Sequence, residues 1–591
     1  MNILGISCYY HDAAAALLMD GELVAAAEEE RFTRKKHDFD FPARAIQFCL
    51  KQGGLCAQDL DYAVFYEKPF EKFERILMTT LQTYPKSWKV FRESMITWLM
   101  DKLWIRQAIQ HELGIEKDKI LFIQHHLSHA ASAFLASPFE EAAILTVDGV
   151  GEWATATYGV GKGLDVSIYK EIRFPHSLGL LYSAFTAFLG FQVNEGEYKV
   201  MGMAPYGEPK YVDKVWKLVQ VFDDGSFGLD MDYFCFHHST SRTFNRKFEA
   251  LFGDPRSPET KFFTAATDYP SYFGDKPGNY QALCKENQHY ADLAASIQKV
   301  TEEVLIKMAR AARQATGLDA LCIAGGVGLN SVANTRILQE TGFDRLYIQP
   351  AAGDGGGALG AALYVYHTML GKPRKLVMKH AYWGQAYGDD EVEAFLEREN
   401  ISYEHVSDPG DVLNRTVDAL TESKVIGWFQ GRFEWGPRAL GNRSILANPA
   451  RADMKDIVNT KIKFREPYRP FAPSVLVEKA EEYFELSDPA KHDPARFMLL
   501  VSPVREDKRD VIPAVTHVDG TGRLQTVFEE TNPLYYKLIQ RLGEATGVPV
   551  ILNTSFNLRG EPIVSTPEDA YLTFSRSEMD MLVMGQYLVY K

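Results

Sequence analysis

Residues 142–149 read Ala-Ala-Ile-Leu-Thr-Val-Asp-Gly, and this segment is the strongest indication of the fold. Six residues that are apolar or β-branched favour a buried strand, and the Asp148-Gly149 pair after them favours a turn. Trp153 to Val160 then returns as a second strand, and Val166 to Arg173 follows as a third. The stretch therefore predicts a meander of strands with an acidic residue at the end of the first.

The start of the chain has a comparable arrangement. Asn2 to Cys8 and Ala13 to Met19 are apolar strands, and Asp20-Gly21 is a preferred hairpin turn into Glu22 to Glu28. Two such modules indicate an internally duplicated, nucleotide-binding α/β architecture of the actin, hexokinase and sugar-kinase type. Residues 69–115 and 290–316 carry apolar positions at helical spacing, which predicts helices that pack on these sheets.

Two histidines precede the quoted stretch. His125 and His129 are four residues apart, so on a helix both imidazoles leave one face, one turn apart. Asp148 and Asp354 could complete a shell of two imidazoles and two carboxylates. That ligand set suits a divalent ion such as Fe(II), Mn(II) or Zn(II), whereas a structural zinc site is richer in cysteine. His126 projects about 100° away from His125 and is expected to pack or to hydrogen-bond.

A glycine run follows another predicted strand. Asp319 to Ala324 is predicted to be a buried strand, and Gly325-Gly326-Val327-Gly328-Leu329-Asn330 leads from it into a helix. Glycines permit close approach of a ligand and a helix start offers free amides, so the run predicts a nucleotide cradle. A plain strand-to-helix turn is the alternative. The residues assigned to nucleotide binding are Gly149, Gly325, Gly326, Gly328 and Asn330.

The composition of the chain changes near Gly371-Lys372-Pro373, where glycine and proline occur close together. We therefore expect a linker there, between a domain of residues 1–370 and a second α/β domain of residues 371–591. Residues 224–288 predict either an insertion that shapes an acceptor pocket or an irregular loop. The strands expected in the second domain are Val425 to Phe429, Phe497 to Val501 and Val548 to Asn553.

Arginines and lysines gather at glycine- and proline-marked turns of the second domain, at residues 431–444 and 461–470. Guanidinium presents a donor fork matched to phosphate or carboxylate, so this density in an acidic chain predicts a bound anion. Residues 553–557, which follow a predicted strand, add short hydrogen-bonding side chains. Surface ion pairs and turn capping are the alternative roles.

Composition narrows the class of protein. A net charge of −14 speaks against a nucleic-acid partner, because such affinity depends on phosphate neutralisation by Lys and Arg. The six cysteines form no Cys-x-x-Cys pair, which favours a reducing cytoplasm. Neither a charged leader nor an apolar stretch of membrane-spanning length is seen, so we expect a cytoplasmic protein without a membrane partner.

Four longer motifs carry a resemblance to a known family. They are residues 5–16, residues 29–36, residues 125–134 and residues 465–474. Together, and in this order, they closely resemble the NodU/CmcH-type O-carbamoyltransferases over nearly the whole chain. The resemblance implies an N-terminal domain like the tRNA threonylcarbamoyl transferase, of the actin-like ATPase (ASKHA) superfamily, and a YrdC-like α/β C-terminal domain.

The resemblance also implies a two-step activity. The YrdC-like domain would make carbamoyladenylate from carbamoyl phosphate and ATP with Mg(II). The N-terminal domain would pass the carbamoyl group to a hydroxyl of a small-molecule natural product such as an antibiotic. Its metal, expected to be Fe(II) with Mn(II) or Zn(II) as alternatives, would be held by positions matching His125, His129, Asp148 and Asp354.

Candidate roles follow from this scheme. A Lys-x-Arg pair at Lys463 and Arg465 and a Ser-x-Asn pair at Ser555 and Asn557 match substrate-binding motifs of the group. His11 lies in a turn between two strands and is our candidate base for the acceptor hydroxyl. The candidate catalytic residues are His11, Arg438, Arg443, Lys463 and Arg465. The candidate substrate-binding residues are Arg432, Ser444, Arg469, Asn553, Ser555 and Asn557.

Other functions compete with this prediction. A tRNA threonylcarbamoyl-type transferase has both domain types, but the acidic charge disfavours a large RNA partner. An actin-like ATP-binding switch without transfer chemistry has no use for a second anion site. The sequence does not identify the acceptor, and it leaves the oligomeric state open, with a homodimer as one option.

Overall fold

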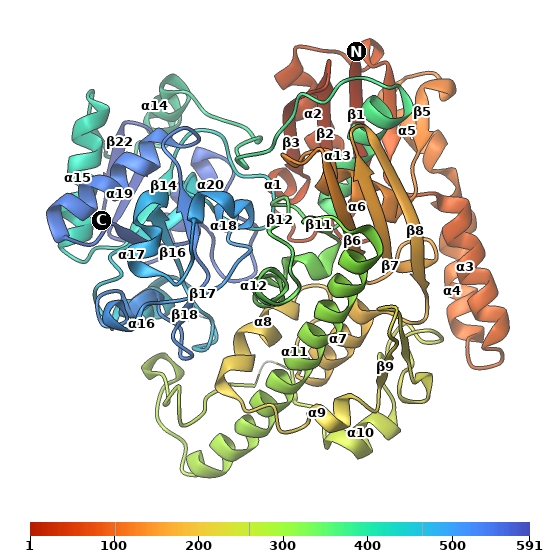
Figure 1. Ribbon diagram of the computed structural model, residues 1–591. Coiled ribbons are helices and arrows are strands. Elements are labelled where there is room, and N and C mark those ends of the chain that lie inside the picture. The colour runs from red at the N-terminus through yellow and green to blue at the C-terminus, as the bar shows by residue number, and fades with distance from the viewer. Residues whose placement is uncertain (101, 259, 464) are drawn as a thin grey trace. The chain divides into compact units, whose positions relative to one another are not determined.

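The computed structural model describes residues 1–591 apart from residues 101, 259 and 464. The chain forms two compact units (Figure 1). Unit 1 comprises Met1–Glu29, Asp38–Thr264 and Asn279–Met378, and unit 2 comprises Glu30–His37, Ala265–Gly278 and Lys379–Lys591. Unit 1 therefore extends past residue 370, and two short segments from the N-terminal part of the chain belong to unit 2. Within the described ranges, no helix has both the length and the apolar character needed to cross a membrane.

Unit 1 contains two five-stranded sheets of the same topology (Figure 1). In each, the first strand pairs antiparallel with the second and parallel with the fourth. The first sheet has the order β3-β2-β1-β4-β5, with β1 (Asn2–Ser7), β2 (Ala14–Met19), β3 (Glu22–Glu28), β4 (Tyr62–Phe65) and β5 (Ile120–Phe122). The second has the order β12-β11-β6-β7-β8, with β6 (Glu141–Val147), β7 (Ala154–Lys162), β8 (Asp165–Arg173), β11 (Ala320–Ala324) and β12 (Arg345–Tyr347). The predicted duplication and α/β fold class are confirmed.

Two helices in equivalent positions bring the sheets together. Helix α6 (His125–Phe134) follows β5 and packs on β6 and β11, whereas α13 (Asp354–Leu363) follows β12 and packs on β1 and β2. The two helices also pack on each other. Gly360 allows this approach, since an added β-carbon would lie 1.8 Å from the carbonyl oxygen of Ser128. The duplication therefore places the first turns of α6 and α13 beside the end of β6.

The remaining helices of unit 1 cover these sheets. The predicted segment 69–115 forms α3 (Pro69–Gln82), α4 (Trp88–Met100) and α5 (Ile105–Leu113). The predicted helix 290–316 is the C-terminal part of α11 (Tyr280–Thr316). Residues 224–288 hold β10 (Phe227–Leu229) and α10 (Arg246–Phe252), and Phe248 and Phe252 of α10 pack against Phe185 of α7 (Leu178–Phe188).

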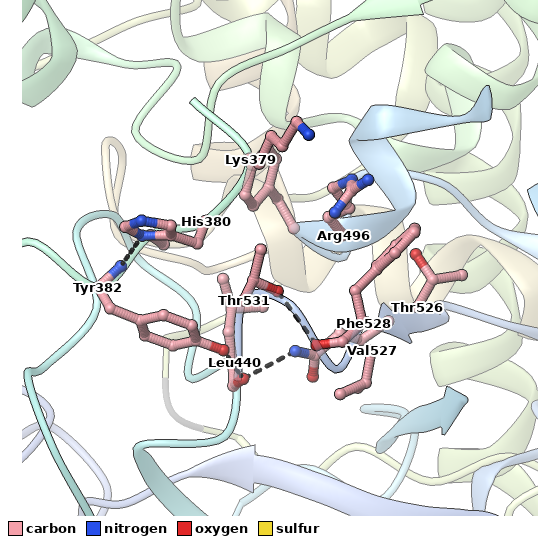
Figure 2. Close-up of a pocket in the computed structure, with 12 residues that line it drawn as sticks. Lys379, His380, Tyr382, Leu440, Arg496, Thr526, Val527, Phe528 and Thr531 are labelled. Carbon is pink, nitrogen blue, oxygen red and sulfur yellow. Dashed lines mark hydrogen bonds between the residues drawn. The ribbon is translucent and has the colours of Figure 1, made fainter. Parts of the chain in front are cut away.

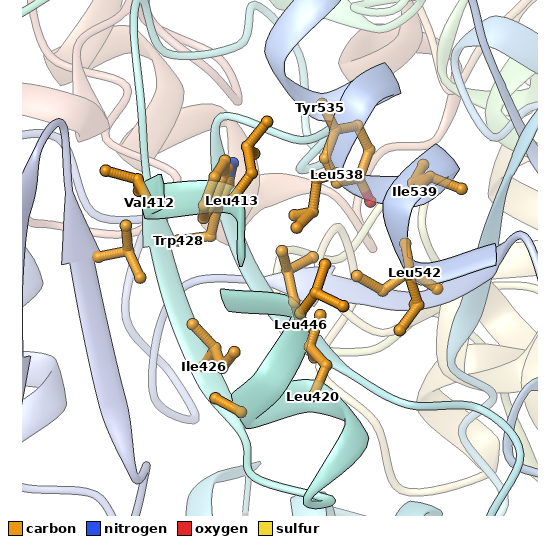
Figure 3. Close-up of a cluster of buried hydrophobic side chains, with 14 of the residues drawn as sticks. Val412, Leu413, Leu420, Ile426, Trp428, Leu446, Tyr535, Leu538, Ile539 and Leu542 are labelled. Atoms are coloured by element: carbon orange, nitrogen blue, oxygen red, sulfur yellow. The ribbon is translucent and has the colours of Figure 1, made fainter. Parts of the chain in front are cut away.

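Unit 2 is built on an eight-stranded sheet in the order β13-β22-β21-β14-β15-β20-β16-β19. Helices α15 (Pro409–Thr421) and α19 (Pro533–Thr546) contribute to a buried cluster with Trp428 of β14 and Leu446 of β15 (Figure 3). The strands are β13 (Glu404–His405), β14 (Ile426–Phe429), β15 (Arg443–Ala447), β16 (Ala472–Leu476), β19 (Gln525–Val527), β20 (Val550–Ser555), β21 (Met581–Met584) and β22 (Tyr587–Tyr590).

One expected strand of unit 2 is wrong. Phe497 to Val501 is irregular and follows the short helix α18 (Asp493–Arg496). Met498 has φ +58°, a left-handed conformation that a strand does not contain. Phe497, Leu499 and Leu500 are nevertheless buried. The apolar run reflects burial, and burial alone does not distinguish a strand from a packed loop.

Candidate functional site

Four predicted metal ligands converge in unit 1. His125 and His129 lie on α6, Asp148 directly follows β6, and Asp354 is the first residue of α13. Nε2 of His125 is 2.9 Å from Asp148 Oδ2 and 3.1 Å from Nε2 of His129. Asp354 Oδ1 is 3.6 Å from both imidazole Nε2 atoms. All four side chains are buried, and we call this set the cage.

The cage fits a divalent ion. Ligand atoms at about 2.1 Å from one ion lie roughly 3 to 3.4 Å apart, and the cage distances scatter around that spacing. Oδ2 of Asp354 is buried without a hydrogen-bond partner among the described residues. Burial lowers the pKa of His129, but hydrogen bonds to Asp148 and Asp354 outweigh it and raise that pKa to about 9. The carboxylates thus attract positive charge into the cage.

His126 is directed away from the cage. Its Nδ1 is 2.7 Å from Thr146 Oγ1, and its Nε2 is 2.9 Å from the carbonyl oxygen of Ala154. Burial, with the neighbouring imidazoles, holds its pKa well below the usual value. The prediction that His126 packs and hydrogen-bonds is confirmed.

The glycine run forms a turn against the cage. Gly325 has φ +93°, and an added β-carbon would lie 2.2 Å from the Val147 carbonyl oxygen, so only glycine fits there. The N–H of Gly326 donates to Oδ1 of Asp148 at 3.0 Å. Asn330 caps α12 (Ser331–Glu340) by accepting the N–H of Ala333. The run therefore shares a carboxylate with the cage. The other assigned positions also make local contacts: Gly328 donates to the carbonyl of Gly325, and the Gly149 carbonyl accepts from Ser177 Oγ.

Sequence reasoning missed two tyrosines beside the cage. The Tyr66 ring packs on the His125 ring with centroids 5.3 Å apart, and its hydroxyl is buried without a partner in the described part of the chain. The Tyr10 hydroxyl would lie 3.7 Å from a β-carbon added at Gly149. Tyr10 directly precedes the candidate base His11, and this position is the one sequence feature that could have indicated a role for Tyr10.

The environment of His11 does not fit a general base. Its Nδ1 is 2.6 Å from Oδ2 of Asp12, and its Nε2 faces the carbonyl oxygen of Asn194. Burial lowers its pKa, but the hydrogen bond to Asp12 outweighs this and raises the pKa to about 10. Two acceptors favour the imidazolium, which donates protons and cannot remove one.

Unit 2 brings the predicted Lys-x-Arg and Ser-x-Asn motifs together. Lys463 ends a short π-helical turn after α16 (Met454–Val458), and Ser555 ends β20. Nζ of Lys463 donates to the Ser555 carbonyl and, at 2.8 Å, to Oδ1 of Asn557. Ser555 Oγ donates to the same Oδ1 at 2.7 Å. Burial, together with the guanidinium groups of Arg465 and Arg469, holds the pKa of Lys463 well below its usual range.

A fifth cation belongs to this neighbourhood. Burial, with the nearby Arg438, Arg465 and Arg469, depresses the pKa of Arg523, and its Nε is buried without a hydrogen-bond partner in the described chain. Sequence reasoning missed Arg523, although Gly522-Arg523 repeats the Gly-Arg pattern of residues 431–432. We call Arg438, Lys463, Arg465, Arg469 and Arg523 the cation cluster.

The other predicted residues of unit 2 bind the protein itself. Arg443 donates to the carbonyls of Gln430, Asn442 and Gly431 and lies 3.6 Å from the Phe429 ring centroid. Arg432 donates to the carbonyls of Trp383 and Gly384. Ser444 Oγ accepts the N–H of Gly441, and Asn553 donates to the Ala439 carbonyl. These contacts fix the loop that carries Arg438.

A small pocket, partly open to solvent, is lined by Leu440 of this loop and by Tyr382, Arg496 and Phe528 (Figure 2). Tyr382 Oη and Gln525 Nε2 both donate to the Leu440 carbonyl, at 2.9 Å and 2.7 Å. Gln525 also accepts from Asn553 at 3.0 Å. Gln525 therefore separates the pocket from a predicted substrate-binding residue. Sequence reasoning did not predict this pocket.

Fold and site together define a class: an α/β protein of two units, one holding a buried imidazole and carboxylate cage and the other a cation cluster. The chain belongs to the carbamoyltransferase family. Residues 2–363 match the family's N-terminal domain, and residues 417–591 match its C-terminal domain. The resemblance drawn from the motifs is confirmed, and the chain is a transferase of this family.

Similarity to individual proteins supports the assignment to this family. The chain is 47% identical to the uncharacterized protein sll1178 of Synechocystis, over 100% of this chain and 97% of the relative. It is 39% identical to nodulation protein NolNO of Sinorhizobium fredii, over 99% and 79%. It is 34% identical to the 3'-hydroxymethylcephem-O-carbamoyltransferase of Streptomyces clavuligerus, over 45% and 47%.

Proposed function

We propose that this chain is an ATP- and metal-dependent O-carbamoyltransferase that forms carbamoyladenylate and passes its carbamoyl group to a hydroxyl of a small molecule. The observation that carries the proposal is the cation cluster. ATP and carbamoyl phosphate are both polyanions, and they approach each other only where fixed cations offset their repulsion. The hydroxymethyl acceptor in the name of the Streptomyces clavuligerus relative supports transfer to oxygen.

We assign the first half-reaction to unit 2. Carbamoyl phosphate and water give carbamate and phosphate, a carbamate oxygen bonds to the α-phosphorus of ATP, and pyrophosphate leaves. Lys463 is held by Ser555 and Asn557, so its ammonium can orient an anion without reorganising. The guanidinium groups around it neutralise the charge that develops on pyrophosphate.

We assign the second half-reaction to unit 1. His125, His129, Asp148 and Asp354 would hold the divalent ion, with Fe(II), Mn(II) and Zn(II) as candidates. Such an ion supplies Lewis-acid stabilisation of negative charge when bound. The alcohol oxygen bonds to the carbamoyl carbon as the bond to the AMP phosphate breaks. Burial of the cage side chains keeps bulk water from competing with the alcohol.

The test is to supply ATP labelled at the α-phosphate, with and without carbamoyl phosphate. We expect AMP and pyrophosphate to form only when carbamoyl phosphate is present. Release of ADP without carbamoyl phosphate would overturn the proposal in favour of an ATP-driven switch. A panel of alcohols, scored by stimulation of AMP release, would then identify the acceptor.

A further inference from the structure

Arg75 is a buried cation that the proposed mechanism does not use. It lies on α3, one turn after Lys72, and its side chain is 8% exposed. Its guanidinium carbon is 5.0 Å from the centroid of the Phe174 ring, and burial lowers its pKa. A ring face attracts the charge of a guanidinium but accepts none of its in-plane N–H groups in a normal hydrogen bond.

The carboxylates nearest to Arg75 are already engaged. Glu67 accepts Nζ of Lys72 at 2.5 Å, and both side chains of that pair are buried. Glu152 accepts the N–H of His125 at 2.9 Å and thereby caps α6. Nε of Arg75 is buried without a hydrogen-bond partner among the described residues. A buried charge with unmet donors is costly unless a ligand or water completes its contacts.

Tyr10 connects Arg75 to the cage. Burial raises the pKa of Tyr10, the charges of Asp354 and Asp148 raise it further, and Arg75 lowers it. The Tyr10 ring also lies 4.6 Å from Nζ of Lys72. The Tyr10 hydroxyl would lie 3.7 Å from a β-carbon added at Gly149, next to Asp148, so Tyr10 has the cage on one side and the α3 turn of Lys72 and Arg75 on the other. A ligand beside Tyr10 would meet an ion in the cage and the guanidinium together.

We propose that Arg75 binds the phosphate of the nucleotide from which the carbamoyl group is transferred. This inference rests on the proposed function of unit 1. In the transfer step the new bond joins the alcohol oxygen to the carbamoyl carbon, and the electron pair of the broken C–O bond passes to the AMP phosphate. The alcohol proton passes to solvent. The N–H groups of Arg75 are placed to stabilise the charge on the departing phosphate.

The test uses Mn(II) in the cage and AMP as the probe. Mn(II) shortens the phosphorus relaxation time of AMP that binds near it, and the part of this effect that is lost in His129→Ala reports AMP beside an ion in the cage. Arg75→Met keeps an apolar stem on Phe174 and removes the charge, Arg75→Lys keeps the charge without the fork, and Arg106→Gln removes another arginine that lies over a phenylalanine in unit 1.

We expect Arg75→Met to weaken AMP binding at the Mn(II) site at least tenfold, with Arg75→Lys intermediate, Arg106→Gln unchanged, and Mn(II) affinity unchanged in all. Equal AMP affinity in wild type and Arg75→Met would overturn the inference and leave the proposed function standing. Absence of relaxation by Mn(II) in the wild type would overturn both. A variant that lost Mn(II) affinity as well would assign Arg75 to holding the fold, against the inference.

Discussion

The cage of unit 1 and the cation cluster of unit 2 are opposite in charge. In the cage, two carboxylates and two imidazoles converge, with their ligand atoms within 4.8 Å of one another, and attract a cation. In the cluster, burial and the neighbouring guanidinium groups lower the pKa of Lys463 and of Arg523, and the gathered positive charge attracts an anion. The buried Lys72–Glu67 pair, at 2.5 Å, shows that this chain satisfies buried charges internally elsewhere. This contrast supports the proposal that the cage binds a cation and that the cation cluster binds an anion.

Substitution of Lys463 in the cation cluster should have the greatest effect on activity. Lys463→Ala removes the ammonium held by Ser555 and Asn557, and we expect carbamoyl-phosphate-dependent pyrophosphate release to fall at least about a thousandfold. Transfer from supplied carbamoyladenylate should persist. The control is Lys479→Ala, a half-exposed lysine paired with Glu482. Undiminished pyrophosphate release by Lys463→Ala would remove the cluster from the reaction.

His129→Ala removes one of the four predicted metal ligands of the cage. Loss of one ligand should weaken binding of the divalent ion by more than about 100-fold, beyond the loss expected for an outer contact. Pyrophosphate release should survive while transfer to the alcohol is lost. His126 lies three residues before His129 on the same helix. The variant His126→Asn should retain the ion because the His126 ring faces Thr146 and Ala154. Equal ion content in all three proteins, measured by elemental analysis, would refute the cage.

Arg523→Met tests whether Arg523 of the cation cluster contacts a bound substrate. We expect KM for ATP or carbamoyl phosphate to rise about tenfold with a smaller change in kcat, because one charge-assisted contact to a bound anion is lost. The exposed Arg505→Met is the matched control. Steady-state kinetics of pyrophosphate release check this. An unchanged KM would exclude Arg523 from the substrate contacts.

The weakest effect on the protein is expected from titration of His11, which belongs neither to the cage nor to the cation cluster. Because its pKa is raised to about 10, its ring should stay protonated through neutral pH and lose its proton near pH 10. Its contribution to stability is therefore complete below its ordinary pKa of 6.5 and lost as the pH rises through about 10. Ring carbon shifts of labelled histidine report the titration, and Asp12→Asn should lower its midpoint. A midpoint near 6.5 in the wild type would restore His11 as a base.

The cage could be placed from the sequence because its parts are local signals. Helical spacing aligned His125 with His129, and a strand that ends in Asp-Gly located Asp148. The repeated strand pattern predicted the duplication that sets α6 beside α13. Each inference needed only neighbours in the sequence, and the duplicated topology supplied the long-range contact.

The members of the cation cluster could not be predicted from the sequence, because they come together through contacts between loops that are distant in the chain. Arg443 and Arg523 lie at similar glycine-marked positions, yet the first donates to backbone carbonyls and the second faces other cations. No local pattern separates these outcomes, since they depend on which loops pack together. The membership of Glu30–His37 in unit 2 is a similar case: Arg31 donates to the Gly436 carbonyl, 405 residues away.

Asp148 offers one oxygen to the cage and the other to the amide of Gly326. Binding of a nucleotide at this turn, which the sequence predicts, would therefore be linked to binding of an ion in the cage. Thermodynamic linkage is reciprocal, so whatever factor the ion contributed to nucleotide affinity, the nucleotide would return to the ion. With favourable coupling, such an enzyme would retain its ion most firmly during turnover and release it most readily in the absence of substrate.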